Sequence, residues 1–495
     1  MVTNNECIII GGGYGGLLCG AILAKNGYKI TIIDQNKQLG GCLQSFGFDK
    51  QLFDSCVHYI GGIHKGSSQL AIFDYLGITA QLHLKPLSHN SFDTIIIDKK
   101  SYALPQGYDA FKAQLQTYFP EEAASIATYL SDIKACCAAV PLYNLKNDDG
   151  TSKAKWASLL LHDYLNNLGM STLLQQVITG NSLLYAGNRN TTSFMMHALI
   201  MNAYILGSAT FERGSAQLTK ALSQIIINNG GTIINKTRIV KIQCANNSVV
   251  YIQDAENNTY KAEHYIANIH PAVLMPMLDG DSLRNIYKQR IINSTNSISA
   301  IMVNLTLKPN TVPYIGTNYY HPEGTLGITT SCNQWALYLK EAPIHKGYAA
   351  SAAILAYDDM NDYKLWEYSK NTKASPQERD DAYKAFKHNK AQKFINAVSK
   401  YHTELANNIT NIQVATPLTF RDYMGTTDGS MYGIVKDAIA PMQNQIPTPT
   451  KLENLYLTGQ NNNLHGILGV SLTALQTCGN LINYDDLLAE IRQYL

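Results

Sequence analysis

Short apolar runs and longer apolar segments of helical length follow one another along the chain, most clearly at its start. Residues 7–10 form an uninterrupted apolar run, as in a buried parallel strand. A longer apolar segment follows and ends near Asn26 and Gly27, and a second strand-like run at 29–33 leads to Asp34. This order predicts a strand, a helix and a parallel strand, the unit from which α/β sheets are built.

The same alternation returns later in the chain. Residues 214–231 have the pattern of an amphipathic helix that ends at glycines, and short strands separated by Asn-rich turns continue to residue 269. At the C-terminal end, a strand at 455–457, a turn at Gly459 and a helix from about Ile467 form another unit. These segments together predict an α/β fold.

Two long stretches interrupt this pattern. The stretch at about 106–204 is mostly helical, and the stretch at about 276–420 opens with strand-like residues. A charged helical pattern near 376–406 is most simply a solvated helix face. Residues 182–207 combine methionines and aromatics with few charges, which suits a channel for a long apolar ligand and equally suits the packing of helices.

The turn after the first strand carries candidate chemistry. Its glycine spacing, G-x-G-x-x-G, combined with the following helix and a terminal acid, matches the dinucleotide-binding fingerprint. The glycines allow a tight turn and close approach of a pyrophosphate, which the helix N-terminus attracts, and the acid can accept hydrogen bonds from the adenosine ribose. The predicted dinucleotide contacts are therefore Gly11, Gly13, Tyr14, Gly16 and Asp34.

Two further glycine motifs favour a flavin over a nicotinamide cofactor. A glycine pair at 40–41 follows the ribose acid closely, although taken alone it is consistent with a simple turn. The C-terminal unit would direct helix N–H groups at the flavin edge that becomes negative on reduction, and an ordinary βα unit is the alternative. FAD is therefore the predicted cofactor, with further contacts from Gly40, Gly41, Ser45, Gly459, Gln460, Gly466 and Ile467.

Composition narrows the range of partners. The 495 residues are enough for two domains, and 45% hydrophobic with 15% charged residues indicates a globular protein. The net charge is +2, from 39 basic and 37 acidic residues, and no basic run is present, so we expect no nucleic-acid partner. The 9 cysteines form no C-x-x-C pair and the 13 histidines show no ligand spacing, so we expect reduced thiols and no metal site.

The apolar runs also bear on localisation. The opening residues, "MVTNNECIII", lack the basic start and continuous apolar core of a signal peptide. No apolar run approaches the roughly 20 residues that span a bilayer. A cytoplasmic protein is expected, and peripheral contact with the inner face of the membrane is the weaker alternative.

Five motifs occur in the order seen in a known family: "IIIGGGYGGL", "FDSCVHYIGG", "GSAQLTKAL", "TPLTFRDYMGTTDGSMYG" and "LYLTGQ". Together they resemble the FAD-dependent retinol saturase and carotenoid isomerase group of the phytoene desaturase and amine oxidase superfamily. Two positions depart from the family pattern. Cys56 stands where many relatives have a glycine, and Asp34 replaces the usual glutamate but keeps its acceptor chemistry.

The resemblance implies a discontinuous organisation. A Rossmann-type FAD-binding domain would consist of residues 1–85, 205–275 and 421–495. An inserted α+β domain at 86–204 and 276–420 would bind the substrate. The predicted fold class is thus α/β, with the second domain threaded through the first.

The resemblance also implies a reaction and a cofactor contact. The group acts on carbon–carbon double bonds of apolar polyenes or isoprenoids, by saturase-like reduction or isomerase-like cis–trans isomerisation. A desaturase, an amine oxidase-type oxidase that uses oxygen, and a non-catalytic flavin- and lipid-binding protein are the alternatives. The backbone of Ile239 would contact adenine. Because no second dinucleotide motif is present, we expect an external electron donor or acceptor.

Two groups of residues are candidates for substrate contact. His58 and Tyr59 are the candidate catalytic residues, since either can supply a proton or position the substrate, and simple packing beside the flavin is the alternative. Arg421, Asp422 and Tyr423 either anchor a polar end of the substrate or form a structural turn.

Overall fold

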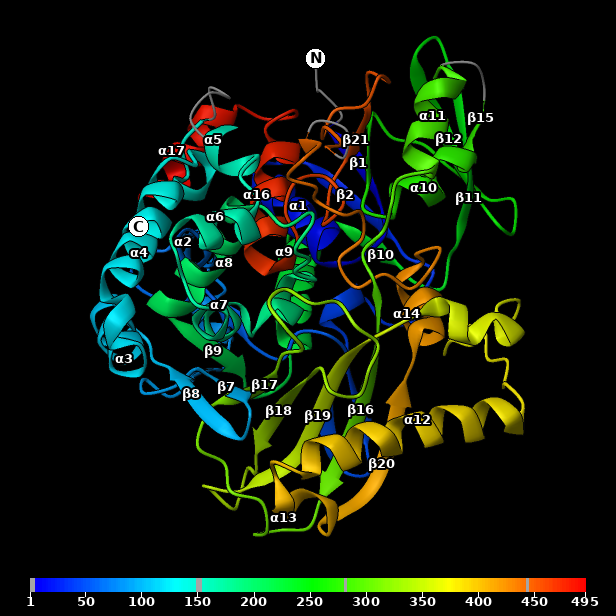
Figure 1. The fold of residues 1–495 in the computed structure, drawn as a ribbon. Helices are drawn as coiled ribbons and strands as arrows, with labels where there is room; N and C mark the ends of the chain where they lie inside the picture. Colours follow the sequence, from blue (N-terminus) through cyan, green and yellow to red (C-terminus); the bar gives the residue numbers. More distant parts are fainter. Residues whose placement is uncertain (1–4, 148–153, 280–282, 442–444) are drawn as a thin grey trace.

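The computed structural model describes residues 5–147, 154–279, 283–441 and 445–495 (Figure 1). Residues 1–4, part of the stretch searched for a signal peptide, lie outside these ranges. Two sheets, of five and seven strands, organise most of the described chain. In the same ranges, no helix combines the length and the apolar character needed to cross a membrane.

The five-stranded sheet has the order β10-β2-β1-β14-β21. Every neighbouring pair is parallel, which explains why these strands are apolar runs rather than alternating ones. The sheet joins segments that are distant in sequence: β1 (Glu6–Ile10), β2 (Lys29–Ile33), β10 (Thr232–Ile234), β14 (His264–Ala267) and β21 (Leu455–Leu457).

The central helix of this part is α1 (Tyr14–Lys25), which packs against α9 (Ala216–Asn228) and α16 (Gly466–Cys478) (Figure 1). Leu17 and Ile22 of α1 are both fully buried. Since α1 is covered by neighbouring helices and by the sheet, its sequence needs no polar face.

The strand order determines where a ligand can bind. β1 lies between β2 and β14, and the chain leaves these parallel strands at one edge of the sheet. Gly11, Asp34, Asn268 and Thr458 follow β1, β2, β14 and β21 directly. The carboxyl edge of a parallel sheet, where the strand order reverses, is the usual place for a bound nucleotide.

The seven-stranded sheet has the order β20-β16-β19-β18-β17-β7-β8. One face packs on α12 (Asp381–Ser399), and the other packs on the helical segment. Along β16, Ile301 and Val303 join the α12 side whereas Met302 joins the helical side, because neighbouring strand residues point to opposite faces. The strands are β7 (Asp93–Ile97), β8 (Lys100–Leu104), β16 (Ser299–Leu307), β17 (Asn318–His321), β18 (Trp335–Glu341), β19 (Ala349–Asp358) and β20 (Ile409–Ala415).

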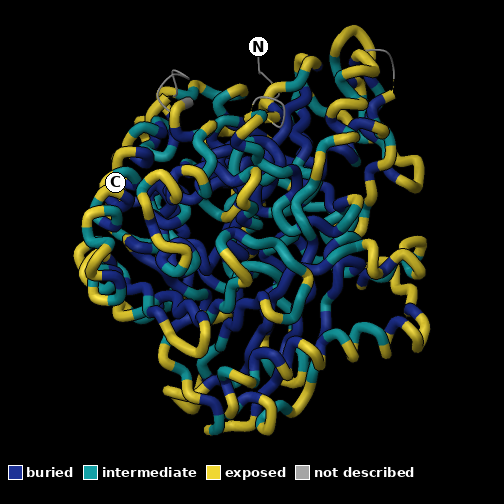
Figure 2. Tube along the Cα trace, viewed as in Figure 1, coloured by how far each residue is buried: buried dark blue, intermediate teal, exposed yellow. Residues whose placement is uncertain are grey.

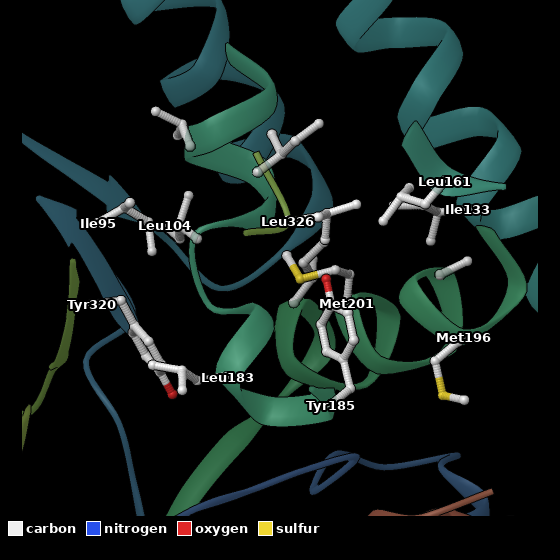
Figure 3. Packing of buried hydrophobic residues seen from close by; sticks show 14 of the residues in the cluster. Ile95, Leu104, Ile133, Leu161, Leu183, Tyr185, Met196, Met201, Tyr320 and Leu326 are labelled. Carbon is white, nitrogen blue, oxygen red and sulfur yellow. The ribbon is translucent and has the colours of Figure 1, made fainter. Parts of the chain in front are cut away.

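The helical segment packs around a large apolar core. Figure 3 shows Leu161 beside Ile133 on one side of this core and Leu183 beside Tyr320 of the sheet on the other, with Met201 between them. Exposed residues follow the outer surfaces of the molecule, and buried residues run through its centre (Figure 2). The principal helices are α3 (Tyr108–Tyr118), α4 (Ala123–Ala138), α6 (Leu161–Asn167), α7 (Thr172–Thr179) and α8 (Phe194–Leu206).

The predicted α/β class, with a Rossmann-type unit and an α+β part, is confirmed. One predicted strand, near 260–269, is wrong in detail because the chain forms two strands there. β13 (Thr259–Tyr260) pairs with β12 (Ser248–Asp254) in a small sheet, and only β14 enters the parallel sheet. The β7–β8 hairpin was not predicted.

Candidate functional site

A large cavity opens at the carboxyl edge of the parallel sheet. Its volume is about 620 Å³, and its wall includes both the glycine turn after β1 and apolar side chains of α8 and the seven-stranded sheet. Such a cavity between two structural parts is the usual form of a small-molecule site. A ligand at the sheet edge and a second ligand beside α8 would therefore share one space.

The glycine turn after β1 forms one end of the wall. Gly11 has a φ of 97°, and a Cβ atom there would lie 2.7 Å from the Asn268 backbone oxygen. Gly13 is the N-cap of α1, and Gly11, Gly13 and Tyr14 all line the cavity. Gly16 packs against Gly11 instead. The unpaired N–H groups at the start of α1 therefore border a space that a pyrophosphate can enter.

Asp34 lies beside this turn in the cavity wall. Its Oδ2 accepts the backbone N–H of Gly12 at 2.7 Å, and its Oδ1 accepts the backbone N–H of Asn36 at 2.7 Å. Burial raises the pKa of Asp34 above its ordinary value, although both hydrogen bonds oppose that shift. Each oxygen has a second lone pair, so the carboxylate can also accept a ribose hydroxyl.

The second glycine pair and Ser45 have different positions. The Gly40 N–H donates to the Gly12 carbonyl at 2.8 Å, and Gly41 lines the cavity. Ser45 does not line it. The Ser45 hydroxyl donates to Asp54 at 2.7 Å and accepts the Ala216 N–H at 3.1 Å, so it joins the hairpin of β3 (Ser45–Phe48) and β4 (Gln51–Asp54) to α9.

The C-terminal unit borders the same cavity. Gly459 and Gly466 have φ angles of 102° and 74°, and α16 begins at Gly466. Gly459, Gln460, Gly466 and Ile467 all line the wall. The N-termini of α1 and α16 therefore both face the cavity, where each favours negative charge on a ligand.

Ile239 lines the cavity at the start of β11 (Ile239–Ala245), together with two cations that the sequence reasoning missed. Arg238 precedes Ile239 directly, so the same turn could have revealed it. Lys370 comes from the long insertion, and no local signal marks it. Burial lowers the pKa of Lys370, and the nearby Arg238 charge adds to that effect.

Of the two predicted catalytic residues, only Tyr59 lies in the cavity wall. Tyr59 lines the cavity and is 4% exposed, and its hydroxyl donates to Asp93 at 2.8 Å and lies 2.7 Å from the Tyr320 hydroxyl. His58 is absent from the wall and stacks on Tyr338, with ring centroids 4.4 Å apart. Burial lowers the pKa of His58 to about 4, so its ring is neutral at neutral pH.

Asp93 is a buried acid next to this tyrosine that the sequence reasoning missed. It also accepts the side-chain amides of Asn181 and Asn318, each at 3.0 Å. Burial raises the pKa of Asp93 to about 6 and raises the pKa of Tyr59 well above its ordinary value. Tyr59 therefore keeps its proton at neutral pH, whereas the Asp93 carboxyl loses its proton near pH 6.

The segment at the end of α14 (Pro417–Met424) lines the cavity but has partners within the protein. Arg421 donates to Asp422 at 2.7 Å and to backbone carbonyls in 367–369, and Asp422 also pairs with Arg379 at 2.5 Å. The Tyr423 hydroxyl accepts a backbone N–H at 3.1 Å. These contacts favour the structural turn over an anchor for the substrate.

The remaining wall is mainly apolar. The 182–207 segment contributes both to this wall and to the protein core, since Met196 lines the cavity and Met201 is fully buried. In the part of the chain that the structure describes, no cluster of side chains is suited to hold a metal ion. The apolar wall residues are Leu184, Met196, Leu199, Ile200, Ala203, Met302, Leu355, Phe420 and Met431.

Comparison with known proteins agrees with this geometry. Residues 9–76 match the NAD(P)-binding Rossmann-like domain. Over 98% of its length, the chain is 24% identical to human all-trans-retinol 13,14-reductase and covers 87% of that protein. It is 25% identical to the Danio rerio protein of the same name, with 96% of the chain and 86% of the relative covered. The chain is thus similar over nearly its whole length to retinol 13,14-reductases.

Solved structures of an oxidoreductase and of oxidases have a fold similar to that of this chain. A Methanosarcina mazei oxidoreductase has a TM-score of 0.64 at 13% identity, covering 95% of this chain and 99% of its own. A variant of putrescine oxidase has a TM-score of 0.66 at 12% identity, covering 97% and 99%. The predicted resemblance to the retinol saturase group and the predicted oxidoreductase class are confirmed.

Proposed function

We propose that this retinol 13,14-reductase relative is an FAD-dependent oxidoreductase that reduces a carbon–carbon double bond of a long apolar polyene. The observation that carries this proposal is the shared cavity, whose wall contains both the dinucleotide motif and an apolar surface. The names of the full-length relatives favour reduction over isomerisation. The solved structures that are named as oxidases resemble this chain in fold alone.

The residues at the sheet edge fit FAD. Gly11 and Gly13 let the turn pack against Asn268 where a Cβ would clash, and Asp34 offers acceptors for a ribose. Gly459 and Gly466 would hold the other end of the cofactor at the start of α16. When bound, FAD supplies the electrons for the reduction.

The apolar wall suits the hydrocarbon part of the substrate. α8 contributes Met196, Leu199 and Ile200, and the seven-stranded sheet contributes Met302 and Leu355. None of these side chains carries charge, and the flexible methionines can adapt to a curved polyene. Burial of such a ligand removes apolar surface from water and excludes water from the reacting carbons.

We assign Tyr59 as the donor of the proton that the reduction of the double bond requires. Its hydroxyl holds a proton between Asp93 and Tyr320, and its high pKa keeps the group protonated. Asp93 accepts the hydrogen bond of this hydroxyl and orients it, and below its pKa of about 6 Asp93 carries a proton that it can pass to Tyr59. His58 is assigned to packing, because it is neutral and stacked on Tyr338.

A substitution in the apolar wall tests the proposal. Ile200→Trp places a larger side chain in the cavity, and we expect it to abolish polyene reduction while FAD binding persists. The control on the same helix is Leu206→Trp, since Leu206 is 37% exposed and outside the wall. Product would be measured by chromatography after anaerobic incubation with all-trans-retinol. Equal loss of product in both variants would contradict the assignment of this wall.

A further inference from the structure

Two cysteines border the cavity where the candidate cofactor motif meets the Tyr59 loop. Cys42 directly follows the second glycine pair, and Cys56 lies two residues before His58. Both line the cavity and both are free thiols. Among the described cysteines they are the two that reach this wall.

The β3–β4 hairpin brings the two cysteines together. Ser45 pairs with Asp54 in the antiparallel ladder, and the Ser55 N–H extends it by donating to the Gln44 carbonyl at 2.9 Å. Beyond that bond, Cys56 follows Ser55 directly, whereas Leu43 separates Cys42 from Gln44. The hairpin therefore brings the two segments that carry Cys42 and Cys56 side by side at the cavity wall.

The side chains of the pair interact directly. A side-chain interaction with Cys56 lowers the pKa of Cys42, and the same interaction together with burial raises the pKa of Cys56. The Cys42 sulfur also lies 3.3 Å from the Met424 sulfur. Cys42 thus ionises first, with Cys56 beside it as a second thiol, which is the arrangement that disulfide exchange requires.

The other cysteines differ from this pair. Cys7, Cys136 and Cys137 are buried, and burial raises the pKa of each thiol above its ordinary value. Cys332 is partly exposed, but it packs beside the seven-stranded sheet and is absent from the cavity wall. Cys332 therefore serves as a control position.

We propose that Cys42 and Cys56 form a dithiol–disulfide couple that exchanges two electrons with FAD. The exchange balances without another reagent: two thiols and oxidised FAD give one disulfide and FADH₂, so the sulfur–sulfur bond forms as both S–H bonds break. The reverse reaction uses FADH₂ to restore the thiols. This inference rests on the proposed function only in requiring FAD in the cavity.

A reductive titration of the purified, fully oxidised holoprotein tests the couple. Anaerobic dithionite should deliver about four electrons per flavin to the wild type, two for FAD and two for the disulfide. Cys42→Ser and Cys56→Ser should each take up about two, and Cys332→Ser should match the wild type. A wild-type uptake of two electrons, or an uptake of four in either serine variant, would overturn the proposal.

Peptide mass spectrometry gives a readout that needs neither turnover nor bound flavin. After oxidation, a peptide cross-linked between positions 42 and 56 should appear, and it should disappear on reduction with dithiothreitol. Absence of this cross-link under all oxidising conditions would refute the couple even if the serine variants lost FAD. The polyene assay tests the proposed function independently of the couple. A flavoprotein that forms the disulfide but does not reduce a polyene would contradict only the proposed function.

Discussion

At the residue scale, the hydroxyl of Tyr59 is the atom on which the proposed proton transfer depends. Tyr59→Phe keeps the ring in the wall and removes the group that donates to Asp93. Because loss of a general acid typically slows a reaction by about 10²–10⁴-fold, we expect product formation to fall by at least about 100-fold. FAD should remain bound, as judged from its absorbance after gel filtration. Unchanged product formation would assign Tyr59 to packing alone.

Asp93 gives a pH prediction at the same scale. Its pKa rises from 3.8 in the unfolded chain to about 6 in the folded protein, because burial disfavours the charged form. Between these values the folded state binds more protons than the unfolded state, so stability falls as the pH rises from about 4 to about 6. The shift corresponds to about 3 kcal/mol of unfolding free energy.

Urea unfolding of the wild type and Asp93→Asn across this pH window checks that prediction. The difference in unfolding free energy between the two proteins should change by about 3 kcal/mol in favour of the variant as the pH rises. The amide cannot ionise, so it lacks this pH dependence. A constant difference from pH 4 to pH 7 would show that Asp93 titrates normally.

At the element scale, the glycines that flank α1, Gly11 and Gly27, differ in the space available for a Cβ atom. Gly11→Ala combines a φ of 97° with a Cβ only 2.7 Å from the Asn268 backbone oxygen, whereas Gly27→Ala, at φ 85°, meets no atom within 4 Å. The Gly27 variant should lose only about 1–2 kcal/mol of stability, which is the cost of a left-handed backbone for a residue with a Cβ. We expect Gly11→Ala to lose more stability and also FAD affinity, measured by urea unfolding and by flavin titration. Equal losses would contradict the close packing at Gly11.

Elements with local signals could be predicted from the sequence. The glycine turn, Asp34 and the start of α16 follow from spacing alone, since the chemistry of the turn lies within one βαβ unit. The split between β13 and β14 could not be seen, because both strands lie in one strand-like stretch and only tertiary pairing separates them. The contacts of Ser45 with Asp54 and Ala216 could not be seen either, since they are made across the fold.

At the scale of the whole molecule, the cavity joins parts that the sequence separates widely. Asp93 reaches Tyr59 because β7 belongs to the seven-stranded sheet, where it pairs with β17 beside Tyr320. Lys370 reaches the nucleotide edge from an insertion. No local pattern encodes such contacts, whereas the order of the motifs did predict the similarity to retinol 13,14-reductases.

The most direct test of the central claim is an anaerobic single-turnover experiment at this same scale. FAD-loaded protein would be reduced with dithionite, freed of excess reductant and mixed with all-trans-retinol while flavin absorbance and products are followed. The account predicts return of the oxidised flavin spectrum together with a product that has gained two hydrogens. Isomerised retinol with the flavin still reduced, or no change in either, would contradict it.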